Sequence, residues 1–263
     1  MEARKTFRGP RAAASLALAA AIAAWSWAAP AAAQAPAGRA EPRTAAEILA
    51  AVEAAERSET ERSTYAMTVR DKAGSRSYRV RMLSRGSEES LIEFLEPRTV
   101  KGLRILSLDD ETWAFFPSTG RTRKISGASR SGSVQGVGGD FSYDDLGSGT
   151  WSKDYAFAIE SESASSWVLA GRSLKPDGSY DRVRMTVDRA LLRETSVDFS
   201  TPKDGFFKTL SFSGHKSFGG RLMPSRMEMR NPAKGTSTIL ELEEAVFDEP
   251  IDPRWFSPER FSK

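Results

Sequence analysis

Alternation of apolar and polar side chains with a period of two runs through most of this chain after Glu59. In residues 65–70, aromatic and apolar residues alternate with small or polar ones. Residues 78–82, 182–188 and 226–230 repeat the pattern, with charged side chains at the polar positions. Because successive side chains of a strand point to opposite faces, this pattern predicts strands with one apolar and one solvated face. Such strands are typical of antiparallel sheets.

Turn signals divide the alternating region into strands of ordinary length. Asp71-Lys72-Ala73-Gly74 separates two alternating segments and predicts a hairpin, and Pro176-Asp177-Gly178 and Lys203-Asp204-Gly205 mark further turns. The other predicted strands are Ser90–Glu96, Leu103–Leu108, Thr112–Phe116, Arg121–Ile125, Tyr155–Ser161, Trp167–Leu174, Leu192–Phe199, Phe206–His215 and Thr238–Val246. This makes about 12 or 13 strands. A sheet of that size with little helix must curl strongly or close, because a flat one would expose its apolar face and its edges.

The first 33 residues have the pattern of a cleavable secretory signal peptide. Four basic residues precede an apolar stretch over residues 12–24, and Ala31-Ala32-Ala33 supplies an A-x-A cleavage site. Residues 34–43 are rich in Ala and Pro and predict a flexible leader. No later apolar run approaches the ~18 residues of a membrane span. We therefore expect an exported protein in the periplasm.

Charge and cysteine content narrow the class of protein further. The chain has a formal charge of +3, but without residues 1–33, which hold four basic and one acidic side chain, 34 of each sign remain. A neutral mature protein argues against nucleic-acid binding, which needs a basic surface. The chain has no cysteine, so it has no lipid-modified N-terminal cysteine and is not expected to be a lipoprotein. Without disulfides, residues 44–263 must be stabilised by an apolar core, and we expect them to form one domain.

One helix is predicted, at the start of the mature chain. Thr44-Ala45-Ala46-Glu47 fits a capping box, in which the Thr hydroxyl and the Glu carboxylate each accept a backbone hydrogen bond. Apolar residues follow at helical spacing, so the helix should run from Thr44 to about Arg57.

A glycine-rich segment, Gly127–Gly149, interrupts the strands. It holds seven glycines and five serines in 23 residues, which is long for a connection. One interpretation is a mobile surface loop followed by a short helical turn, which Asp140 is placed to cap. The other is a lid over a pocket, because glycines permit large backbone changes and long loops often gate sites. The predicted lid residues are Gly139, Asp140, Phe141, Tyr143 and Leu146.

Three segments in sequence carry a resemblance to a known family. Trp113-Ala114-Phe115-Phe116-Pro117 precedes the basic strand Arg121–Ile125, and Gly138-Gly139-Asp140-Phe141-Ser142-Tyr143-Asp144-Asp145-Leu146 follows. Together with the signal peptide, helix and hairpin, they resemble the outer-membrane lipoprotein-sorting protein family, the LolA-like group. The resemblance implies a mainly β fold: a strongly bent antiparallel half-barrel, with an N-terminal helix and a short lid across its open apolar face.

The resemblance also implies a function and partners. Members of the group carry the lipid part of lipoproteins through the periplasm, bind lipids, sense mislocalised lipoproteins for an envelope-stress pathway, or accompany lipid exporters. The implied cargo is an acyl lipid or lipoprotein. The implied partners are an inner-membrane transporter or an outer-membrane receptor, with transient membrane contact.

Inward positions of the alternating strands supply a broad apolar surface for such a cavity. Methionine is frequent among them, and its flexible thioether adapts to variable apolar ligands. The alternative is that these side chains simply pack a solid core. The predicted cavity residues are Tyr65, Met67, Tyr78, Val80, Met82, Trp113, Phe115, Phe157, Met185, Val187, Leu210, Phe212, Met227 and Met229.

Catalytic and metal-binding patterns are weak in this sequence. His215 is the only histidine, and no G-x-S-x-G motif accompanies it. Asp140, Ser142 and Asp144 imitate the first ligands of a calcium loop, but Asp145 stands where the turn glycine is needed. We therefore expect neither an enzyme nor a bound metal or cofactor. Two hypotheses remain: a periplasmic lipid or lipoprotein carrier, and a lipid-sensing or accessory subunit that works with a membrane partner.

Overall fold

The protein is mainly β, as predicted. The computed structural model describes residues 44–263, so the predicted signal peptide (residues 1–33) and flexible leader (residues 34–43) lie outside the described part. Within it, 13 strands form one antiparallel sheet and two short strands form a second. Two α-helices and two 3-10 helices complete the described elements.

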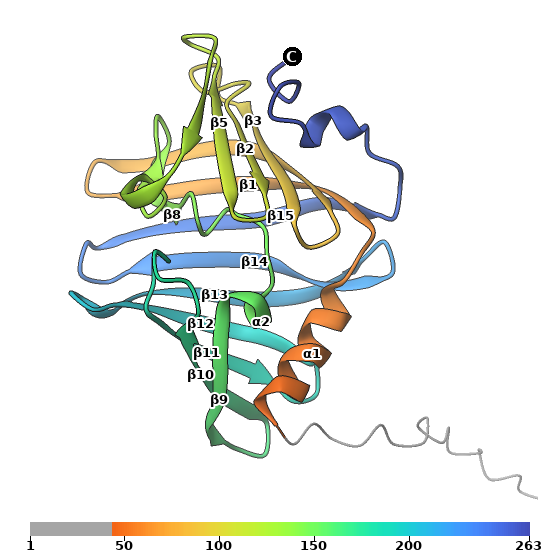
Figure 1. Cartoon of the computed structure of the whole chain (residues 1–263), viewed down its shortest axis with the longest axis vertical. Coiled ribbons are helices and arrows are strands. Elements are labelled where there is room, and N and C mark those ends of the chain that lie inside the picture. The colour runs from red at the N-terminus through yellow and green to blue at the C-terminus, as the bar shows by residue number, and fades with distance from the viewer. Residues whose placement is uncertain (1–43) are drawn as a thin grey trace, which may run out of the picture. The chain divides into compact units, whose positions relative to one another are not determined.

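Helix α1 (Ala45–Glu56) begins where the capping box predicts. The Thr44 hydroxyl accepts a hydrogen bond from the Glu47 backbone N–H at 3.2 Å, and the Glu47 carboxylate accepts one from the Thr44 N–H at 2.9 Å. Its apolar side packs against β9 and β12 on the concave face of the sheet (Figure 1).

Hairpins join nearly all the strands of the large sheet. Its order is β6-β5-β4-β3-β2-β1-β15-β14-β13-β12-β11-β10-β9, with every neighbouring pair antiparallel. The chain therefore starts near the middle, runs outward to β6, crosses to β9, and returns to pair β15 with β1. The strands are β1 (Thr60–Asp71), β2 (Gly74–Arg85), β3 (Glu89–Glu96), β4 (Arg104–Leu108), β5 (Glu111–Phe116), β6 (Arg121–Ile125), β9 (Tyr155–Glu162), β10 (Ser166–Ser173), β11 (Arg182–Asp188), β12 (Arg193–Thr201), β13 (Gly205–Phe218), β14 (Arg221–Asn231) and β15 (Thr236–Phe247).

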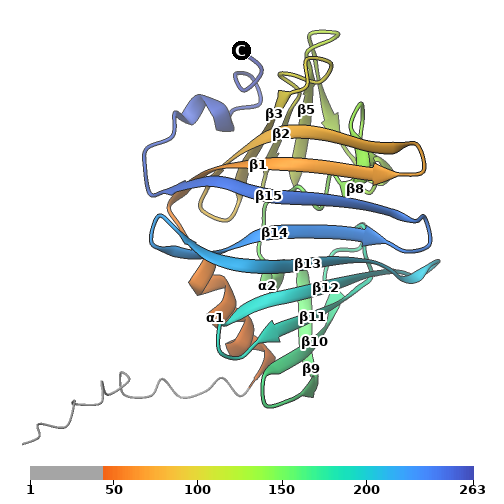
Figure 2. The same ribbon diagram turned by 180° about the vertical axis from the view of Figure 1, so that it is seen from behind.

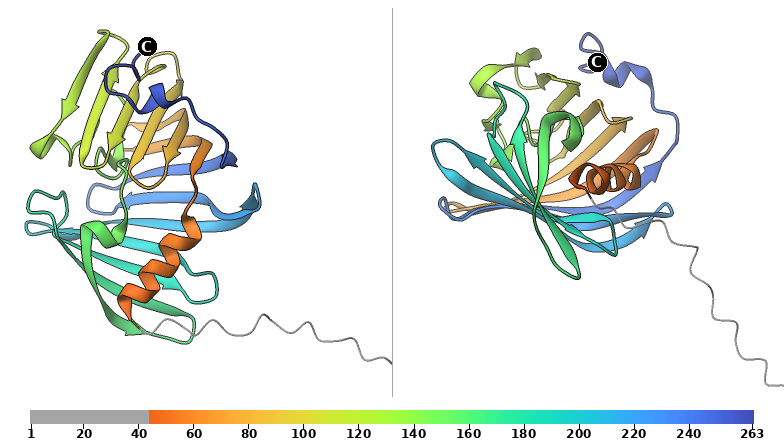
Figure 3. Two further views of the ribbon diagram at one scale, coloured as in Figure 1. Left: turned by 45° about the vertical axis from the view of Figure 1, so that its right-hand side comes forward. Right: turned by 60° about the horizontal axis from the view of Figure 1, so that its bottom comes forward.

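This order forces the glycine-rich segment across the sheet. Edge strands β6 and β9 lie at opposite ends of the strand order, and residues 126–154 connect them. The connection holds η1 (Gly127–Ser129), β7 (Ser133–Val134), β8 (Gly138–Ser142) and α2 (Trp151–Asp154). It crosses the concave side, where β8 packs against β1, β14 and β15 (Figures 1 and 3). The segment is therefore not a surface loop throughout: residues 127–133 are largely exposed, whereas Val134, Val137 and Phe141 are buried against the apolar face.

The large sheet bends into an open trough. Figure 3 shows α1 and α2 lying within its concavity, and the view from behind in Figure 2 shows the strands of the convex face. Strands β6 and β9 do not pair with each other, so the sheet does not close into a barrel. The predicted half-barrel with an N-terminal helix is thus confirmed.

Charged side chains cover the convex face of the central strands. Cross-strand ion pairs join Arg79 to Glu243 at 2.8 Å, Arg184 to Glu160 at 2.7 Å, and Arg226 to Glu241 at 3.1 Å. These pairs lie at the polar positions of the alternating pattern, so the predicted wet face is confirmed.

The convex face of β2–β5 is different, because the C-terminal segment covers it. Here η2 (Pro253–Phe256) and the residues after it place Ile251, Phe256 and Phe261 against Leu83, Leu91 and Leu106 in a second apolar cluster. Arg104 fixes the end of the chain by donating to the Phe261 carbonyl at 2.7 Å. Both faces of these strands are consequently apolar.

Candidate functional site

Two cavities open on the concave side of the sheet. The first, of about 420 Å³, lies between the β4–β5 turn, the crossing connection and the β10–β11 turn. The second, of about 900 Å³, lies between the C-terminal end of α1 and the β2–β3 hairpin. Residues Gly147 to Trp151 line both cavities, so this short stretch separates one from the other.

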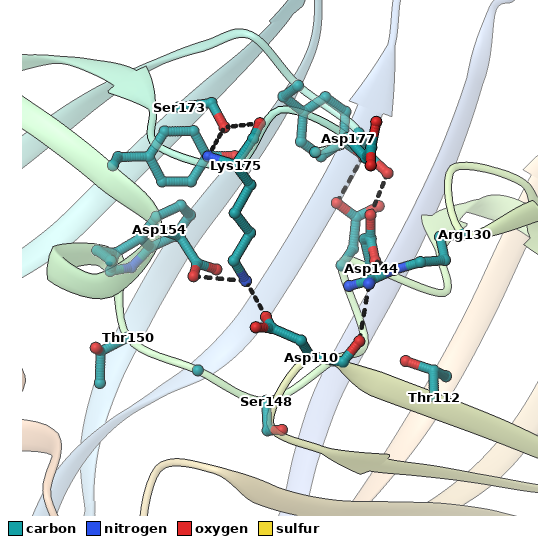
Figure 4. A pocket seen from close by; sticks show the side chains of 18 of the residues that line it. Asp110, Thr112, Arg130, Asp144, Ser148, Thr150, Asp154, Ser173, Lys175 and Asp177 are labelled. Atoms are coloured by element: carbon teal, nitrogen blue, oxygen red, sulfur yellow. Dashed lines mark hydrogen bonds and ion pairs between the residues drawn. The ribbon is translucent and has the colours of Figure 1, made fainter. Parts of the chain in front are cut away.

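Charged side chains line one wall of the first cavity, as Figure 4 shows. Lys175 Nζ lies 2.5 Å from an Asp110 carboxylate oxygen and 2.7 Å from an Asp154 carboxylate oxygen. The hydrogen bond from Lys175 lowers the pKa of Asp110 below its ordinary value. Nearby, Arg130 Nε donates to Asp144 at 2.6 Å. Apolar and aromatic residues complete the lining: Trp151, Tyr155, Tyr180, Phe199 and Leu210.

The second cavity has a similar mixture of surfaces. Met82 on β2 and Trp151 on α2 supply apolar surface, and charged side chains of both signs surround them. The charged lining residues are Glu53, Glu56, Arg57, Glu59, Glu89, Arg221 and Asp248. A molecule with an apolar chain and a charged headgroup matches this combination.

The stretch Gly147–Asp154, which we call the partition segment, is held mainly by exposed polar contacts. Its Ser148 hydroxyl donates to the Glu88 carbonyl at 2.7 Å, and its Ser152 hydroxyl and N–H both donate to Glu53 at 2.9 Å. Lys153 pairs with Glu88 and Asp109. Exposed pairs of this kind each contribute roughly 0–1 kcal/mol, because water replaces them readily. Apart from Trp151, whose ring packs against the main apolar cluster beside Tyr155 and Phe199, the partition segment is therefore held by individually weak contacts.

Gly138–Leu146, the segment of the predicted lid, is held much more firmly. Lys208 Nζ on β13 lies 2.6 Å from Asp145 Oδ2, and the two side chains are only 5% and 3% exposed. Asp145 also accepts hydrogen bonds from the Tyr180 hydroxyl at 2.8 Å and the Ser142 N–H at 2.7 Å. This segment thus resembles a fixed cover more than a swinging lid, and the lightly held part of the connection begins at Gly147.

The lid side chains lie over the concave face, Phe141 on extended β8 and Tyr143 and Leu146 on the turn that follows it. Phe141, Tyr143 and Leu146 are all buried in the main apolar cluster. The predicted helical turn is present, since the Leu146 N–H donates to the Ser142 carbonyl at 3.3 Å, but Ser142 caps it by accepting from the Asp145 N–H. The prediction that Asp140 caps it is wrong, because Asp140 lies within β8. Asp140 instead accepts hydrogen bonds from the Thr236 and Thr238 hydroxyls of β15.

Gly139 is needed where β8 approaches the sheet. Its φ is +87°, and a Cβ at this position would lie 2.7 Å from the Thr238 hydroxyl oxygen and 3.2 Å from a Val69 methyl carbon. Only glycine combines this backbone angle with such a close approach.

Most of the predicted cavity residues face the concave side but are covered. Seven are buried in the main apolar cluster: Tyr65, Met67, Tyr78, Val80, Met185, Val187 and Met229. Five are partly buried and pack against it: Met82, Phe157, Leu210, Phe212 and Met227. Met82 reaches the second cavity and Leu210 reaches the first. In this closed arrangement the apolar face is therefore mostly core, and two cavities give access to part of it.

Trp113 and Phe115 do not belong to the concave surface, which corrects the prediction. Along β5, Ala114 faces the main cluster, whereas Trp113 and Phe115 pack against the second cluster on the convex face. Alternation alone does not show which side chains of β5 point to the concave face, because the C-terminal segment makes the convex side apolar as well.

Several site residues were missed by reasoning from the sequence. Glu194 faces inward because a bulge shifts the register of β12 against β11 at Thr186/Val187, and a strict alternation assigns it to the wrong face. Lys208 lies on the same face of β13 as Leu210, so alternation places it inward, but a lysine is rarely assigned to a buried position. Trp151 offered a signal that could have been used, since a large aromatic residue directly after a glycine-rich stretch is a candidate anchor.

Comparison with known proteins gives the family and the fold. The model of a family described as "Uncharacterized protein" matches residues 86–263, more than half of the chain. The chain belongs to this family. No curated protein matches it in sequence.

Solved structures show which fold this chain resembles. A DUF1329 family protein from Desulfovibrio piger has 21% sequence identity and a TM-score of 0.74, over 80% of this chain and 95% of its own. An outer membrane lipoprotein-sorting protein domain from Vibrio parahaemolyticus has 24% identity and a TM-score of 0.73, over 83% and 97%. A LolA superfamily protein from Nitrosomonas europaea has 20% identity and a TM-score of 0.70, over 82% and 98%. At these identities the likenesses show the LolA-like fold.

Residues 44–263 contain no group of three or more His, Cys, Asp or Glu side chains arranged to hold a metal ion. None of the helices in this part of the chain is both long and apolar enough to span a membrane.

Proposed function

We propose that this protein carries lipid or lipoprotein acyl chains through the periplasm, between the inner and outer membranes. The observation behind the proposal is the pair of cavities that share one boundary. Both open onto the same apolar concave face, and only the lightly held partition segment separates them. Movement of that segment would join them into one groove along the apolar face.

The side chains along such a groove suit acyl chains. Met82, Leu210, Phe212 and Met227 are only partly buried in the closed arrangement, so opening requires little disruption of the core. Methionine adapts to chains of different length and saturation. The charged walls of both cavities would keep a headgroup near water.

The energetics of burial favour a carrier. Removing about 15 methylene groups from water contributes roughly 12 kcal/mol at about 0.8 kcal/mol each, which is enough to hold a chain in the aqueous periplasm. Transfer of the same chain from a membrane interior to the protein changes its free energy very little, because both surroundings are apolar. A small change, such as movement of the partition segment at a partner or membrane, is then sufficient to release the cargo.

The proposal includes no catalytic step. His215, the sole histidine, lies on β13, and its Nε2 has no hydrogen-bond partner among the described residues. Burial and the Arg193 charge lower its pKa. Most charged side chains at the first cavity form ion pairs with one another. These pairs hold the β4–β5 and β10–β11 turns against the crossing connection.

Mass spectrometry of lipids extracted from the purified, exported protein tests the proposal first. Binding of a fluorescent fatty acid then compares two variants. Met82→Glu should abolish binding because it places a charge on the apolar cavity wall, whereas Phe206→Glu, on an exposed side chain 42% accessible, should leave binding unchanged. Absence of co-purified lipid together with absence of fatty-acid binding would refute the proposal.

A transfer assay separates a carrier from a sensing or accessory subunit. Labelled lipid or lipoprotein should move from donor to acceptor vesicles faster in the presence of the protein. Binding without any transfer would overturn the carrier function and favour a protein that reports cavity occupancy to a membrane partner.

A further inference from the structure

Four hydroxyl side chains form a row across the concave face of strands β2 to β5. In the register of these strands, Ser84 lies opposite Ser90, Ser90 opposite Ser107, and Ser107 opposite Thr112. Each of the four is two positions along its strand from an apolar residue that belongs to the main cluster or packs against it, and residues two apart in a strand share a face. We call these four residues the hydroxyl row.

The hydroxyl row runs from one cavity to the other. Ser84 and Ser90 line the second cavity, and Thr112 lines the first. Ser107 stands between them in the strand order and is only 1% exposed. The row therefore spans the boundary between the cavities, where the partition segment lies. That segment is bound to the β2–β3 hairpin beside the row, through the Gly149 N–H and the Ser148 hydroxyl.

The two middle hydroxyls of the row have no partner. Ser90 Oγ and Ser107 Oγ are buried and form no hydrogen bond among the described residues. Hydroxyls that anchor the crossing connection are bonded instead: Ser142 donates to Asp145 at 2.8 Å, and Thr238 donates to Asp140 at 3.2 Å. A buried hydroxyl without a partner is unfavourable. Two such groups side by side point to a ligand group that binds them once the partition segment has moved.

The residues before and after the row match the parts of an amphiphile. Two positions farther from the β2–β3 and β4–β5 turns, the same face carries an apolar row in the same register: Met82, Ile92, Ile105 and Ala114. The turns themselves carry exposed acidic residues: Glu88, Asp109 and Asp110. Charged, neutral polar and apolar surfaces thus follow one another along these strands, and the two rows are about 7 Å apart.

We propose that the hydroxyl row binds the ester carbonyl of an acyl-ester lipid, with the acyl chain on the apolar row and the headgroup toward the turns. This inference rests on the proposed function, because it names the chemical linkage of the cargo. A carbonyl oxygen accepts two hydrogen bonds and carries no net charge. It partners Ser90 and Ser107 without placing an ion among uncharged side chains, which a free carboxylate would do.

A matched pair of ligands tests the linkage directly. A 1-palmitoyl lysophosphatidylcholine and its 1-O-hexadecyl ether analogue have the same headgroup and chain length, and only the first has a carbonyl. Each competes with a fluorescent fatty acid for the purified, exported protein, below the concentration at which micelles form. The wild-type protein should bind the ester about fivefold more tightly, the scale of one neutral hydrogen bond.

Variants locate the preference within the protein. Ser90→Ala and Ser107→Ala should each lower the preference for the ester, and the double variant should bind ester and ether equally. Ser77→Ala is the matched control, because Ser77 is an exposed serine of β2, and it should keep the full preference. Circular dichroism checks that each variant is folded, and each single variant is a test independent of the other.

Infrared spectroscopy separates binding from a purely structural role of the two serines. A carbonyl that accepts hydrogen bonds absorbs at lower frequency than a free one. A lysolipid with a ¹³C-labelled ester carbonyl should therefore absorb at lower frequency in the wild-type protein than in the double variant. The same frequency in both proteins would contradict contact between the carbonyl and the row.

The outcomes distinguish this inference from the proposed function. Equal binding of ester and ether by the wild-type protein refutes ester recognition and leaves the acyl-chain carrier in place. A preference that survives in the double variant refutes the assignment to Ser90 and Ser107. Failure to bind either lysolipid or the fatty acid refutes the carrier proposal and the inference with it.

Discussion

Replacement of Asp145 by Asn should destabilise the protein strongly, because it breaks the buried pair that holds the crossing connection. The Asp145 and Lys208 side chains are 3% and 5% exposed, with 2.6 Å between the charged atoms. The variant leaves the Lys208 ammonium buried with one carbonyl contact, to Asp140 at 3.2 Å, and the rings of Tyr180 and Phe199 at 4.8 and 5.2 Å. Removing one partner of a buried pair costs about 3–5 kcal/mol, out of a total stability of about 5–15 kcal/mol.

Urea denaturation followed by tryptophan fluorescence measures this loss. Asp177→Asn is the matched control, because Asp177 is an exposed aspartate in the lining of the first cavity, and its free energy of unfolding should change by less than about 0.5 kcal/mol. Joint replacement of Asp145 by Asn and Lys208 by Met should recover most of the loss, because no charge is then left unpaired and the Asn oxygen can still accept from the Tyr180 hydroxyl or the Ser142 N–H. A loss below about 1 kcal/mol for Asp145→Asn would refute the pair as the anchor of the connection.

Three further changes test other parts of the structure. Gly139→Ala should lower stability by about 1–3 kcal/mol in thermal unfolding, since its Cβ would collide with the Thr238 hydroxyl; an unchanged Tm would contradict this close approach. Phe261→Ala should cost about 3–5 kcal/mol by opening a cavity in the second cluster, where Phe261 is 0% exposed; a loss typical of a surface substitution would contradict that packing. Glu56 has a raised pKa, so its contribution to stability is complete below its ordinary pKa of 4.5 and is lost as pH rises through the higher folded value. Glu56→Gln should therefore unfold with a flatter pH profile and be more stable than wild type at pH 8, and parallel profiles would contradict the raised pKa of Glu56.

Much of the fold could be predicted from local patterns. The capping box at Thr44 fixes α1 because its two hydrogen bonds are made within one turn of the chain. The period-2 pattern locates β1 closely because only the concave face of this strand is buried. At Trp113 and Phe115 the convex face is also covered, so the pattern no longer shows which side chains point to the concave face. Burial on the convex side depends on residues 251–261, far along the chain.

The site was harder to predict for the same reason. The glycine-rich segment crosses the sheet because β6 and β9 are opposite edges, and this is a property of strand order rather than of local sequence. Its anchor, Asp145 with Lys208, joins residues 63 positions apart. A bulge turns Glu194 inward, and bulges leave no mark in an alternating pattern. The lid motif could be recognised, but its separation into a fixed part and a partition segment required the tertiary contacts.

Locking the partition segment in place tests whether its movement opens the groove to an acyl chain. The chain has no cysteine, so Ser87→Cys with Ser148→Cys introduces the only thiols, next to the 2.7 Å hydrogen bond from the Gly149 N–H to the Ser87 carbonyl. Uptake of a fluorescent fatty acid is measured in the cross-linked protein, after reduction, and in each single-cysteine variant. The cross-link should block uptake, and reduction should restore it to the level of the single variants. Equal uptake by the fully cross-linked and the reduced protein would contradict the claim that this segment opens the groove.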